Sequence, residues 1–456
     1  EGGGFSNDRV WDFGGLPVAI VSNVTINPGG SLTVVPGQVV KLNPSVGIDA
    51  NGSFIAKGTA DNPIIFTSSF DDTAGGDSNF DGSATVPSRG DWEALILDDG
   101  SGVTELEHVE IRFAGDSNFT GAGAQVQALQ LGKPNTTVSD VLVKESSTTA
   151  VRIENNSPTL TRVSVEGTGG NGFALDNNAT PVLRELSVTG ADGVSVRQEG
   201  GGFSNDRVWD FGGLPVLLTS NLTVNQGGSL TIVPGQVVKV NTSVSIDVNG
   251  SLVADATSQA PIIFTSSFDD TAGGDTNFDG SASTPNRGDW RGLFLDDGGA
   301  GVTLRNVEVR FAGDSNFTGA GGFEPAVHLG KAQTVLEDVI VRDVSSTGVN
   351  IVGGDPLLDG VSVFRAGGAA FFARLAAEPT YTNLSAADNG GDFVQLQNGT
   401  ISDNDRTWDF GGLPVHLASS ITVNTGSKLT IVPGQVVKLP PSAFLDFNGV
   451  VEAVGS

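Results

Sequence analysis

A long internal repeat constrains the fold of this chain more than any other feature. The segment Glu1–Val18 reads EGGGFSNDRVWDFGGLPV, and it recurs without a change at Glu199–Val216. A third version, SDNDRTWDFGGLPV, ends at Val415, so the copies lie about 198 residues apart. Copies this similar are expected to share one fold. We therefore predict two full copies and a partial third, at residues 1–198, 199–397 and 398–456.

Each copy is built from short runs rich in Val, Ile, Leu, Phe and Thr, separated by Gly, Asn, Asp or Pro. Runs such as SLTVV alternate apolar and polar residues, as half-buried strands do, and no window keeps a period of 3.6. The class is therefore all-β. The runs come in sets of about three per 20 to 30 residues, which favours a right-handed parallel β-helix, a solenoid of stacked coils. A β-sandwich or another β array stays an alternative.

The order WDFGGLPV, VTINPGGSLTVVPGQVVKL, PIIFTSS, DDTAGGDSNFDG, GDW and VEIRFAG resembles a known family. It is similar to the right-handed parallel β-helix repeat regions of large bacterial and archaeal secreted or cell-surface proteins, which carry Asp-rich calcium loops. The resemblance covers nearly the first 120 residues of each copy. It departs after GDW, where the family continues with Gly-Gly-Ile and this chain has Glu93-Ala94 and Arg291-Gly292. The resemblance implies a secreted or surface-exposed protein with an adhesive or structural role.

The charge balance excludes some partners. The chain has 52 acidic against 24 basic residues, a formal charge of -28, so we expect neither nucleic acid nor an anionic membrane surface as a partner. It has no cysteine, and no methionine even at position 1. We expect a mature, processed chain located outside the cell or on its surface, without direct membrane insertion.

Two acidic loops carry the clearest site signal. Residues 70–91 begin with FDDTAGGDSNFDG, and residues 268–289 begin with FDDTAGGDTNFDG. Asp-x-Asn-x-Asp-Gly places oxygen donors at alternate positions before a glycine turn, as at the start of an EF-hand loop. We predict Ca²⁺ rather than Mg²⁺, because the loop offers many protein oxygens; a solvated acidic corner is the alternative. The predicted ligands are Asp71, Asp72, Asp77, Asn79, Asp81 and Asp91, and in the second copy Asp269, Asp270, Asp275, Asn277, Asp279 and Asp289.

A fainter echo of the motif, GDSNFTG, follows each loop at Gly115–Gly121 and Gly313–Gly319. Its third acid is replaced by threonine, so it predicts either a weaker metal site or a segment that packs against the first loop through Phe119. The possible ligands are Asp116, Asn118, Asp314 and Asn316.

The residues point away from catalysis. His108, His328 and His416 have no histidine at the matching positions of the other copies, and no histidine-based catalytic set or zinc cluster is visible. We therefore predict that the chain is not an enzyme. The alternative is a polysaccharide lyase, epimerase or hydrolase, or a carbohydrate-binding surface module, since pairs of carboxylates cannot be judged without their spacing.

These observations lead to one functional expectation. The chain is expected to be a calcium-stabilised extracellular rod with a structural or adhesive role. No capping helix is visible at either end of the sequence, so we expect either a segment of a longer stalk or end-to-end stacking into a filament. The expected partners are further copies of itself, or a cell-surface or polysaccharide partner.

Overall fold

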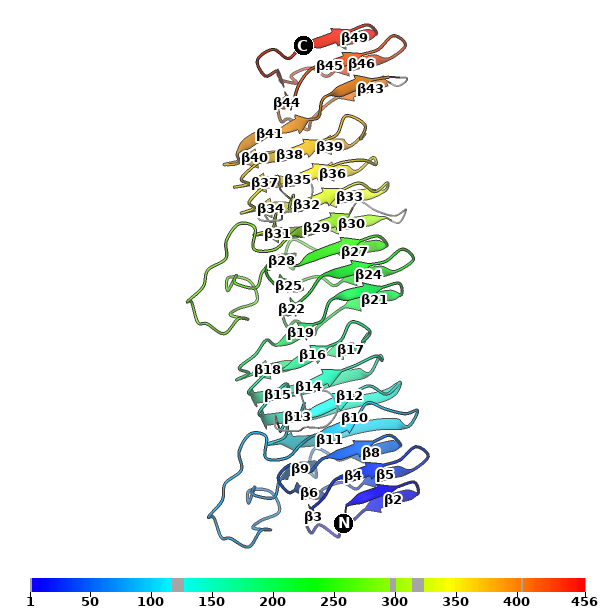
Figure 1. Ribbon diagram of the computed structural model, residues 1–456, viewed down its shortest axis with the longest axis vertical. Coiled ribbons are helices and arrows are strands. Elements are labelled where there is room, and N and C mark those ends of the chain that lie inside the picture. The colour runs from blue at the N-terminus through cyan, green and yellow to red at the C-terminus, as the bar shows by residue number, and fades with distance from the viewer. Residues whose placement is uncertain (1, 117–126, 296–300, 314–323, 403–404, 456) are drawn as a thin grey trace. The chain divides into compact units, whose positions relative to one another are not determined.

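The computed structural model describes residues 2–116, 127–295, 301–313, 324–402 and 405–455. These residues form 49 strands and no helix, and every strand pair with a defined register is parallel. Consecutive strands lie on different faces and pair with strands one coil away, so the predicted all-β parallel solenoid is confirmed (Figure 1). Since no helix occurs in these ranges, none is long and apolar enough to cross a membrane.

The chain forms two compact units. The first runs to Glu199 and also contains Asp210–Leu217 and Asp275–Gly280, and the second contains the other described residues. Strand β22 (Val216–Leu218) lies at a point in the sequence where the chain passes from the first to the second.

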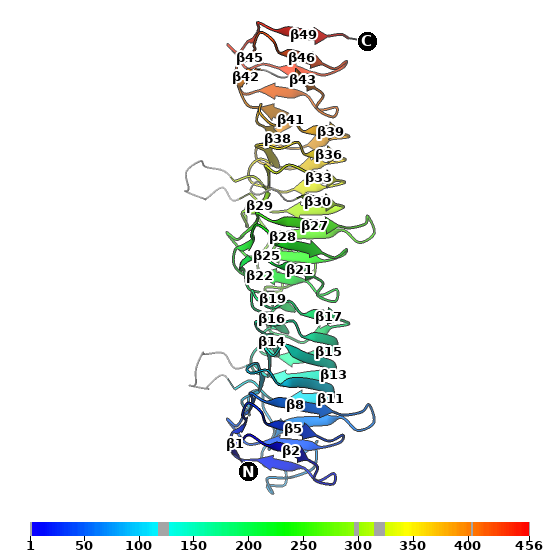
Figure 2. The ribbon, with the colours of Figure 1, turned by 90° about the vertical axis from the view of Figure 1, so that its right-hand side faces the viewer.

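The first unit stacks its strands in three columns (Figure 2). The first column consists of β1 (Gly3–Phe5), β4 (Val24–Ile26), β7 (Ile48–Ala50), β10 (Leu95–Leu97), β12 (Leu129–Leu131), β14 (Val151–Ile153), β16 (Phe173–Leu175) and β19 (Val196–Gln198). The second consists of β2 (Asp8–Trp11), β5 (Ser31–Val34), β8 (Ser53–Lys57), β11 (Val103–Arg112), β13 (Asn135–Ser146), β15 (Thr159–Thr168) and β17 (Val182–Arg184). The third consists of β3 (Val18–Ile20), β6 (Val39–Leu42), β9 (Ile64–Ser68), the later halves of β11, β13 and β15, and β18 (Ser187–Thr189).

The second unit repeats this plan. One column holds β20 (Gly201–Phe203), β23 (Leu222–Val224), β26 (Ser245–Val248), β29 (Gly292–Leu295), β32 (Val327–Leu329), β35 (Val349–Ile351), β38 (Ala369–Ala373), β41 (Gly391–Leu396), β44 (Val415–Leu417) and β47 (Val437–Lys438). Another holds β21 (Asp206–Trp209), β24 (Ser229–Ile232), β27 (Ser251–Asp255), β30 (Val302–Arg305), β33 (Thr334–Glu337), β36 (Leu357–Asp359) and β39 (Thr380–Thr382). A third holds β25 (Val237–Val240), β28 (Ile262–Ser266), β31 (Val307–Arg310), β34 (Ile340–Arg342), β37 (Ser362–Phe364) and β40 (Ser385–Ala387). Two short sheets follow, β42 (Gly399–Ile401) with β45 (Ile421–Val423) and β48 (Leu445–Phe447), and β43 (Asp405–Trp408) with β46 (Lys428–Ile431) and β49 (Val450–Ala453).

The core lies inside the coils. Alternate residues of each strand point inward and stack on the matching residue of the next coil, as Leu129, Val151 and Phe173 do. All three are fully buried. The period-two pattern read from the sequence therefore places the apolar residues correctly.

One corner departs from the expected chemistry. Sharp corners favour Gly and Asn, which adopt a positive φ most readily, yet β11, β13 and β15 bend at His108, Asp140 and Arg162, with φ of 48°, 53° and 52°. The residues stack coil on coil, and Arg162 forms a two-pronged ion pair with Asp140 (2.6 and 2.7 Å). Contacts between neighbouring coils offset the strain of these left-handed residues.

Candidate functional site

The first acidic loop lies between β9 and β10 and projects from the stacked strands (Figure 1). Its base is held by Asp71, whose carboxylate is fully buried. Asp71 accepts hydrogen bonds from the Thr67 hydroxyl (2.6 Å) and the Thr73 amide (3.1 Å), and Arg112 lies 3.4 Å away. Burial alone would raise the pKa of Asp71, but these hydrogen bonds and the Arg112 charge outweigh it and lower the pKa. Asp71 therefore stays ionised and ties the loop to the coil.

Asp91 closes the same loop. Its Oδ2 accepts hydrogen bonds from the Ser68 hydroxyl (2.6 Å) and the Ser88 amide (3.0 Å). The second copy repeats both arrangements. Asp269 accepts from Thr265 (2.6 Å) and pairs with Arg310 (3.2 Å), and Asp289 accepts from Ser266 (2.6 Å) and the Asn286 amide (2.9 Å). These four predicted ligands are thus engaged at the bases of the loops.

Three other predicted ligands of the first loop converge. Asp72, Asp77 and Asp81 each place a carboxylate oxygen within 4.8 Å of the others. Asn79 joins them, because its Nδ2 donates to Asp81 Oδ2 at 2.8 Å. Gly82 donates its amide to Asp77 Oδ2 at 2.9 Å, so the glycine turn shapes the loop as predicted. We call Asp72, Asp77, Asn79 and Asp81 the acidic cluster.

Two oxygens of the acidic cluster lack a protein donor. Asp72 Oδ1 and Asn79 Oδ1 are buried without a hydrogen-bond partner among the described residues. A buried oxygen normally finds a partner, because losing hydration without one is costly. These oxygens, together with the crowded carboxylates, suit a cation.

Sequence reasoning missed a lysine beside this cluster. Lys41 is fully buried, and its Nζ donates to the Gly76 carbonyl inside the loop. Burial lowers the pKa of Lys41, while the charges of Asp72, Asp71 and Asp77 oppose that shift. The sequence does contain a signal for this contact, because Lys41 lies within the apolar run QVVKL. A lysine buried in such a strand needs a polar partner for its ammonium group. Lys239 donates to the Gly274 carbonyl in the same way in the second copy.

The second loop keeps the local hydrogen bonds of the first. Asn277 donates to Asp279 Oδ2 at 2.9 Å, and Asp275 accepts from the amides of Phe278 (2.7 Å) and Gly280 (2.9 Å). Asp270 is half-buried and follows directly after Asp269. The motif therefore dictates the local turn in both copies.

The predicted weaker sites are described in part. Asp116 is buried and accepts a hydrogen bond from the Ser45 hydroxyl at 2.8 Å. Asn118, Asp314 and Asn316 lie outside the described residues.

A second group of carboxylates was not predicted. Glu93 is 4% exposed, directly after Trp92. Burial, and then the charges of Asp116 and Asp49, raise its pKa to about 6. We call Glu93, Asp49 and Asp116 the Glu93 group. Arg291 stands at the position of Glu93 in the second copy and pairs with Glu324 at 2.7 Å, so the two copies differ in chemistry here.

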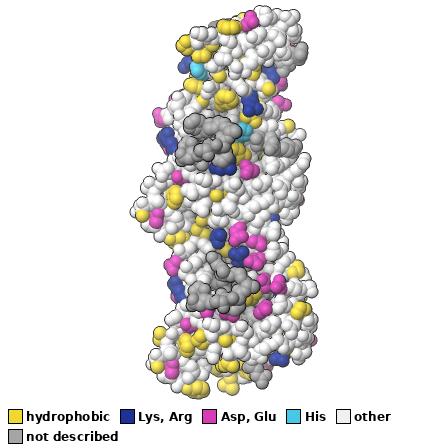
Figure 3. Space-filling view, viewed as in Figure 1, with side chains coloured by type: hydrophobic (Ala, Val, Ile, Leu, Met, Phe, Trp, Pro, Cys, Tyr) yellow, Lys and Arg dark blue, Asp and Glu magenta, His cyan; other side chains and the backbone are white. Residues whose placement is uncertain are grey.

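The Glu93 group belongs to a polar face of the first unit. Acidic and basic side chains gather over its middle strands (Figure 3). Gln130 on β12 donates to Asp98 at 2.6 Å, and Arg152 on β14 lies 3.4 Å from Glu199. Trp92 contributes no ring to this surface, because it is fully buried and donates its indole N–H to the Arg112 carbonyl (2.7 Å).

No protein-family model and no curated protein matches the sequence. Two solved structures show a distant likeness. A lacto-N-biosidase of glycoside hydrolase family 136 from Eubacterium ramulus is 9% identical with a TM-score of 0.18, over 94% of this chain and 63% of that one. The catalytic domain of a family 87 α-1,3-glucanase, solved with tetrasaccharides, is 10% identical with a TM-score of 0.18, over 98% and 68%. This chain thus spans about two thirds of their length.

These comparisons correct one prediction. The expectation that the chain is not an enzyme is contradicted, because both of these structures are glycoside hydrolases. The prediction relied on the lack of a histidine-based catalytic set, whereas glycoside hydrolysis needs only two suitably placed carboxylates, whose spacing depends on the fold. With TM-scores of 0.18, neither structure supplies an argument for a particular activity of this chain.

Proposed function

We propose that the acidic loops bind Ca²⁺ and that the chain is a calcium-stabilised β-solenoid. The main observation is the acidic cluster, in which three carboxylates meet within 4.8 Å and two buried oxygens lack a partner among the described residues. Calcium takes six to eight oxygen ligands in flexible geometry, so carboxylates, an amide oxygen and waters suit it. The second loop has nearly the same sequence, which leads us to propose one site in each full copy.

The role proposed with these sites is structural or adhesive, outside the cell. Extracellular calcium modules bind at about 0.1 to 1 mM, the range expected of an exposed loop with few rigid ligands. Copies of the chain, or a cell-surface or polysaccharide component, are the proposed partners. Calcium would neutralise part of the formal charge of -28 and hold the loops to the coils.

The test is a melting curve in about 2 mM CaCl₂ and in EDTA. Calcium at about 2 to 20 times its dissociation constant adds about 0.6 to 1.8 kcal/mol of stability per site, an upward shift of the melting temperature by up to a few degrees. We expect Asp77→Asn to remove part of the shift, and Asp77→Asn with Asp275→Asn to remove nearly all of it. The matched control is Asp61→Asn, which changes an exposed aspartate outside the loops.

The melting temperature in EDTA distinguishes loss of calcium binding from misfolding. A folded variant should melt in EDTA at or slightly above the melting temperature of the parent, whereas a misfolded variant would melt below it. The folded variants lose carboxylate repulsion and keep the bonds of Asp71 and Asp91. Equal melting temperatures of the parent with calcium and with EDTA would refute the calcium proposal.

A second candidate function is hydrolysis of a polysaccharide at the Glu93 group. The observation that favours it is a buried glutamate with a pKa near 6 beside two further carboxylates. Such a glutamate carries its proton below about pH 6 and can then donate it to the leaving glycosidic oxygen, while an ionised neighbour acts as base or nucleophile.

Release of reducing ends from a panel of neutral and acidic polysaccharides tests this candidate. We expect Glu93→Gln to lower the rate at least about 100-fold, the usual contribution of a general acid. Glu105→Gln, on the surface of β11, is the control and should keep the rate. Failure to cleave any polysaccharide, or full activity in Glu93→Gln, would rule the site out.

A further inference from the structure

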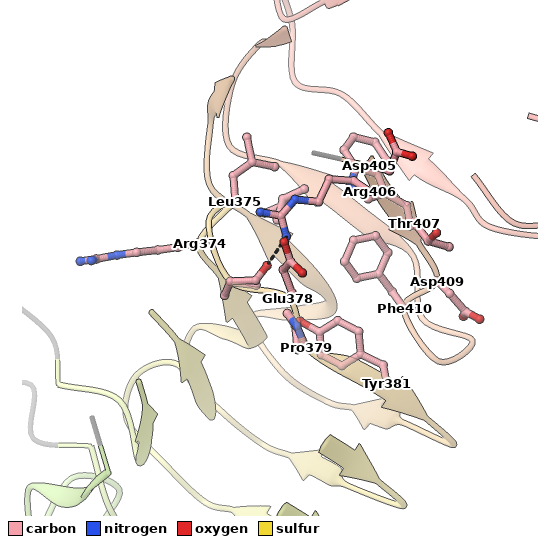
Figure 4. Close-up of a pocket in the computed structure, with 14 residues that line it drawn as sticks. Arg374, Leu375, Glu378, Pro379, Tyr381, Asp405, Arg406, Thr407, Asp409 and Phe410 are labelled. Atoms are coloured by element: carbon pink, nitrogen blue, oxygen red, sulfur yellow. Dashed lines mark hydrogen bonds and ion pairs between the residues drawn. The ribbon is translucent and has the colours of Figure 1, made fainter. Parts of the chain in front are cut away.

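The second unit contains a cavity where the third copy begins. The column that ends with β39 does not continue into β42 or β43, which start two new sheets, while β44 pairs with β41. This break in stacking leaves a cavity of about 280 Å³ between the β39 coil and β43 (Figure 4). Regular coil stacking fills such space with inward side chains, so the cavity follows from the restart of the repeat.

An aromatic wall with a buried hydroxyl lines the cavity. The ring of Tyr381 lies 5.6 Å from that of Phe410, which lies 6.3 Å from Trp408. Tyr381 is 7% exposed, and its hydroxyl has no hydrogen-bond partner among the described residues. A buried tyrosine hydroxyl usually finds a partner. Burial raises the pKa of Tyr381, so this hydroxyl keeps its proton and can donate.

A guanidinium lies across from this wall (Figure 4). Arg406 forms an ion pair with Glu378 (2.7 Å), and its Nη1 donates to the Ala377 carbonyl at 3.3 Å. Its Nε is buried and has no hydrogen-bond partner in the described part of the chain. Two residues that line the cavity thus hold a buried donor without a partner among the described residues, the Tyr381 hydroxyl and the Arg406 Nε–H.

The residues that carry these two donors have different surroundings, or a different identity, from the matching residues of the earlier copies. In the earlier copies the matching arginines stack on phenylalanine, Arg9 over Phe5 at 4.2 Å and Arg207 over Phe203 at 4.0 Å. The third copy has Ile401 at that position, so Arg406 has no ring there to cover. In the first copy, Leu183 and Thr180 stand where Tyr381 and Glu378 stand here. A cavity that merely separated coils would not need an added hydroxyl and carboxylate.

We propose that this cavity binds one neutral sugar residue. Sugar hydroxyl oxygens accept from Tyr381 and Arg406, and a C–H face of the ring packs on the aromatic wall. Glu378 and Asp405 line the cavity, so an anionic ligand meets repulsion as well as the Arg406 charge. The volume lies just below the usual range of drug-sized pockets, which suits a single ring. This proposal is independent of the calcium loops and of the Glu93 group.

The experiment uses saturation-transfer NMR with the full chain. The probes are the methyl glycosides of glucose, galactose, mannose and N-acetylglucosamine, with methyl glucuronide and inorganic phosphate as anionic probes. A monosaccharide is expected to bind with a dissociation constant of about 1 mM. Tyr381→Phe removes only the hydroxyl and should weaken binding about five- to tenfold, the effect of one lost hydrogen bond.

Two further variants separate this site from general effects. Arg406→Gln should also weaken binding, whereas Arg207→Gln, the same position one copy earlier, should leave it unchanged. A melting curve of each variant shows that it is folded. Binding of no neutral sugar, binding of the anionic probes alone, or equal affinity in folded Tyr381→Phe would each overturn the proposal.

Discussion

At the scale of single residues, the structure separates neighbours that the sequence places together. Asp71 and Asp72 are adjacent, yet Asp71 is fully buried against Thr67 and Arg112, while Asp72 meets Asp77 and Asp81. Both residues lie in the turn that follows β9, which directs Asp71 to the base of the loop and Asp72 to the other carboxylates. A tally of acidic residues in the loop cannot tell these roles apart.

Lys133 supplies a prediction at this scale. It is fully buried, its Nζ donates to the Gly52 carbonyl at 2.6 Å, and burial lowers its pKa to about 8. Between about pH 8 and the unfolded value near 10.5, the unfolded chain binds a proton that the folded chain has lost. The free energy of unfolding should therefore rise with pH in this window, by up to about 3 kcal/mol.

Urea unfolding at several pH values between 7.5 and 10.5 measures this effect. Lys133→Met should show a smaller rise, because Lys41, whose pKa is also lowered by burial, still contributes, and Lys57→Met, which changes an exposed lysine, should keep the full rise. The same pH dependence in the parent and in Lys133→Met would contradict the assignment.

At the scale of elements, each coil depends on the two coils beside it. Leu129 on β12, Val151 on β14 and Phe173 on β16 form one inward stack, continued by Val196 on β19. All are fully buried, so each side chain closes the space left by its neighbours. The free energy of unfolding is therefore expected to fall when a side chain in these stacks is made smaller. It should change little when a side chain on the outer side of the strands is made smaller.

Phe173→Ala tests this sensitivity. Removing the ring leaves a cavity that the stacked coils cannot close, so we expect a loss of about 3 to 5 kcal/mol. Val182→Ala on β17 truncates a valine that is 43% exposed and should change stability by less than about 0.5 kcal/mol. Equilibrium unfolding in guanidinium chloride compares the two variants, and similar losses in both would speak against the inward stack as the source of stability.

At the scale of the whole molecule, duplication explains both the likeness and the differences between copies. The loop bases repeat closely, with Asp71 paired to Arg112 and Asp269 to Arg310. The position of Glu93 does not repeat, since Arg291 replaces it in the second copy. Duplicated coils retain what stacking and the acidic loops need, whereas other positions are free to change.

The fold and the turn of the acidic loops could be predicted from sequence because both depend on local patterns. Period-two alternation and the exact repeat of Glu1–Val18 lead to a solenoid, and Asp-x-Asn-x-Asp-Gly leads to a turn closed on Asp77. These inferences need only residues a few positions apart.

Tertiary structure alone decided which distant residues meet. Lys41 reaches the Gly76 carbonyl from an earlier coil, and Tyr381 lines the same cavity as Arg406. Burial, and then the charges of Asp116 and Asp49, raise the pKa of Glu93. The sequence by itself determined the coils, because their pattern is local. The register between coils determined the sites, because stacking joins residues that are twenty or more positions apart.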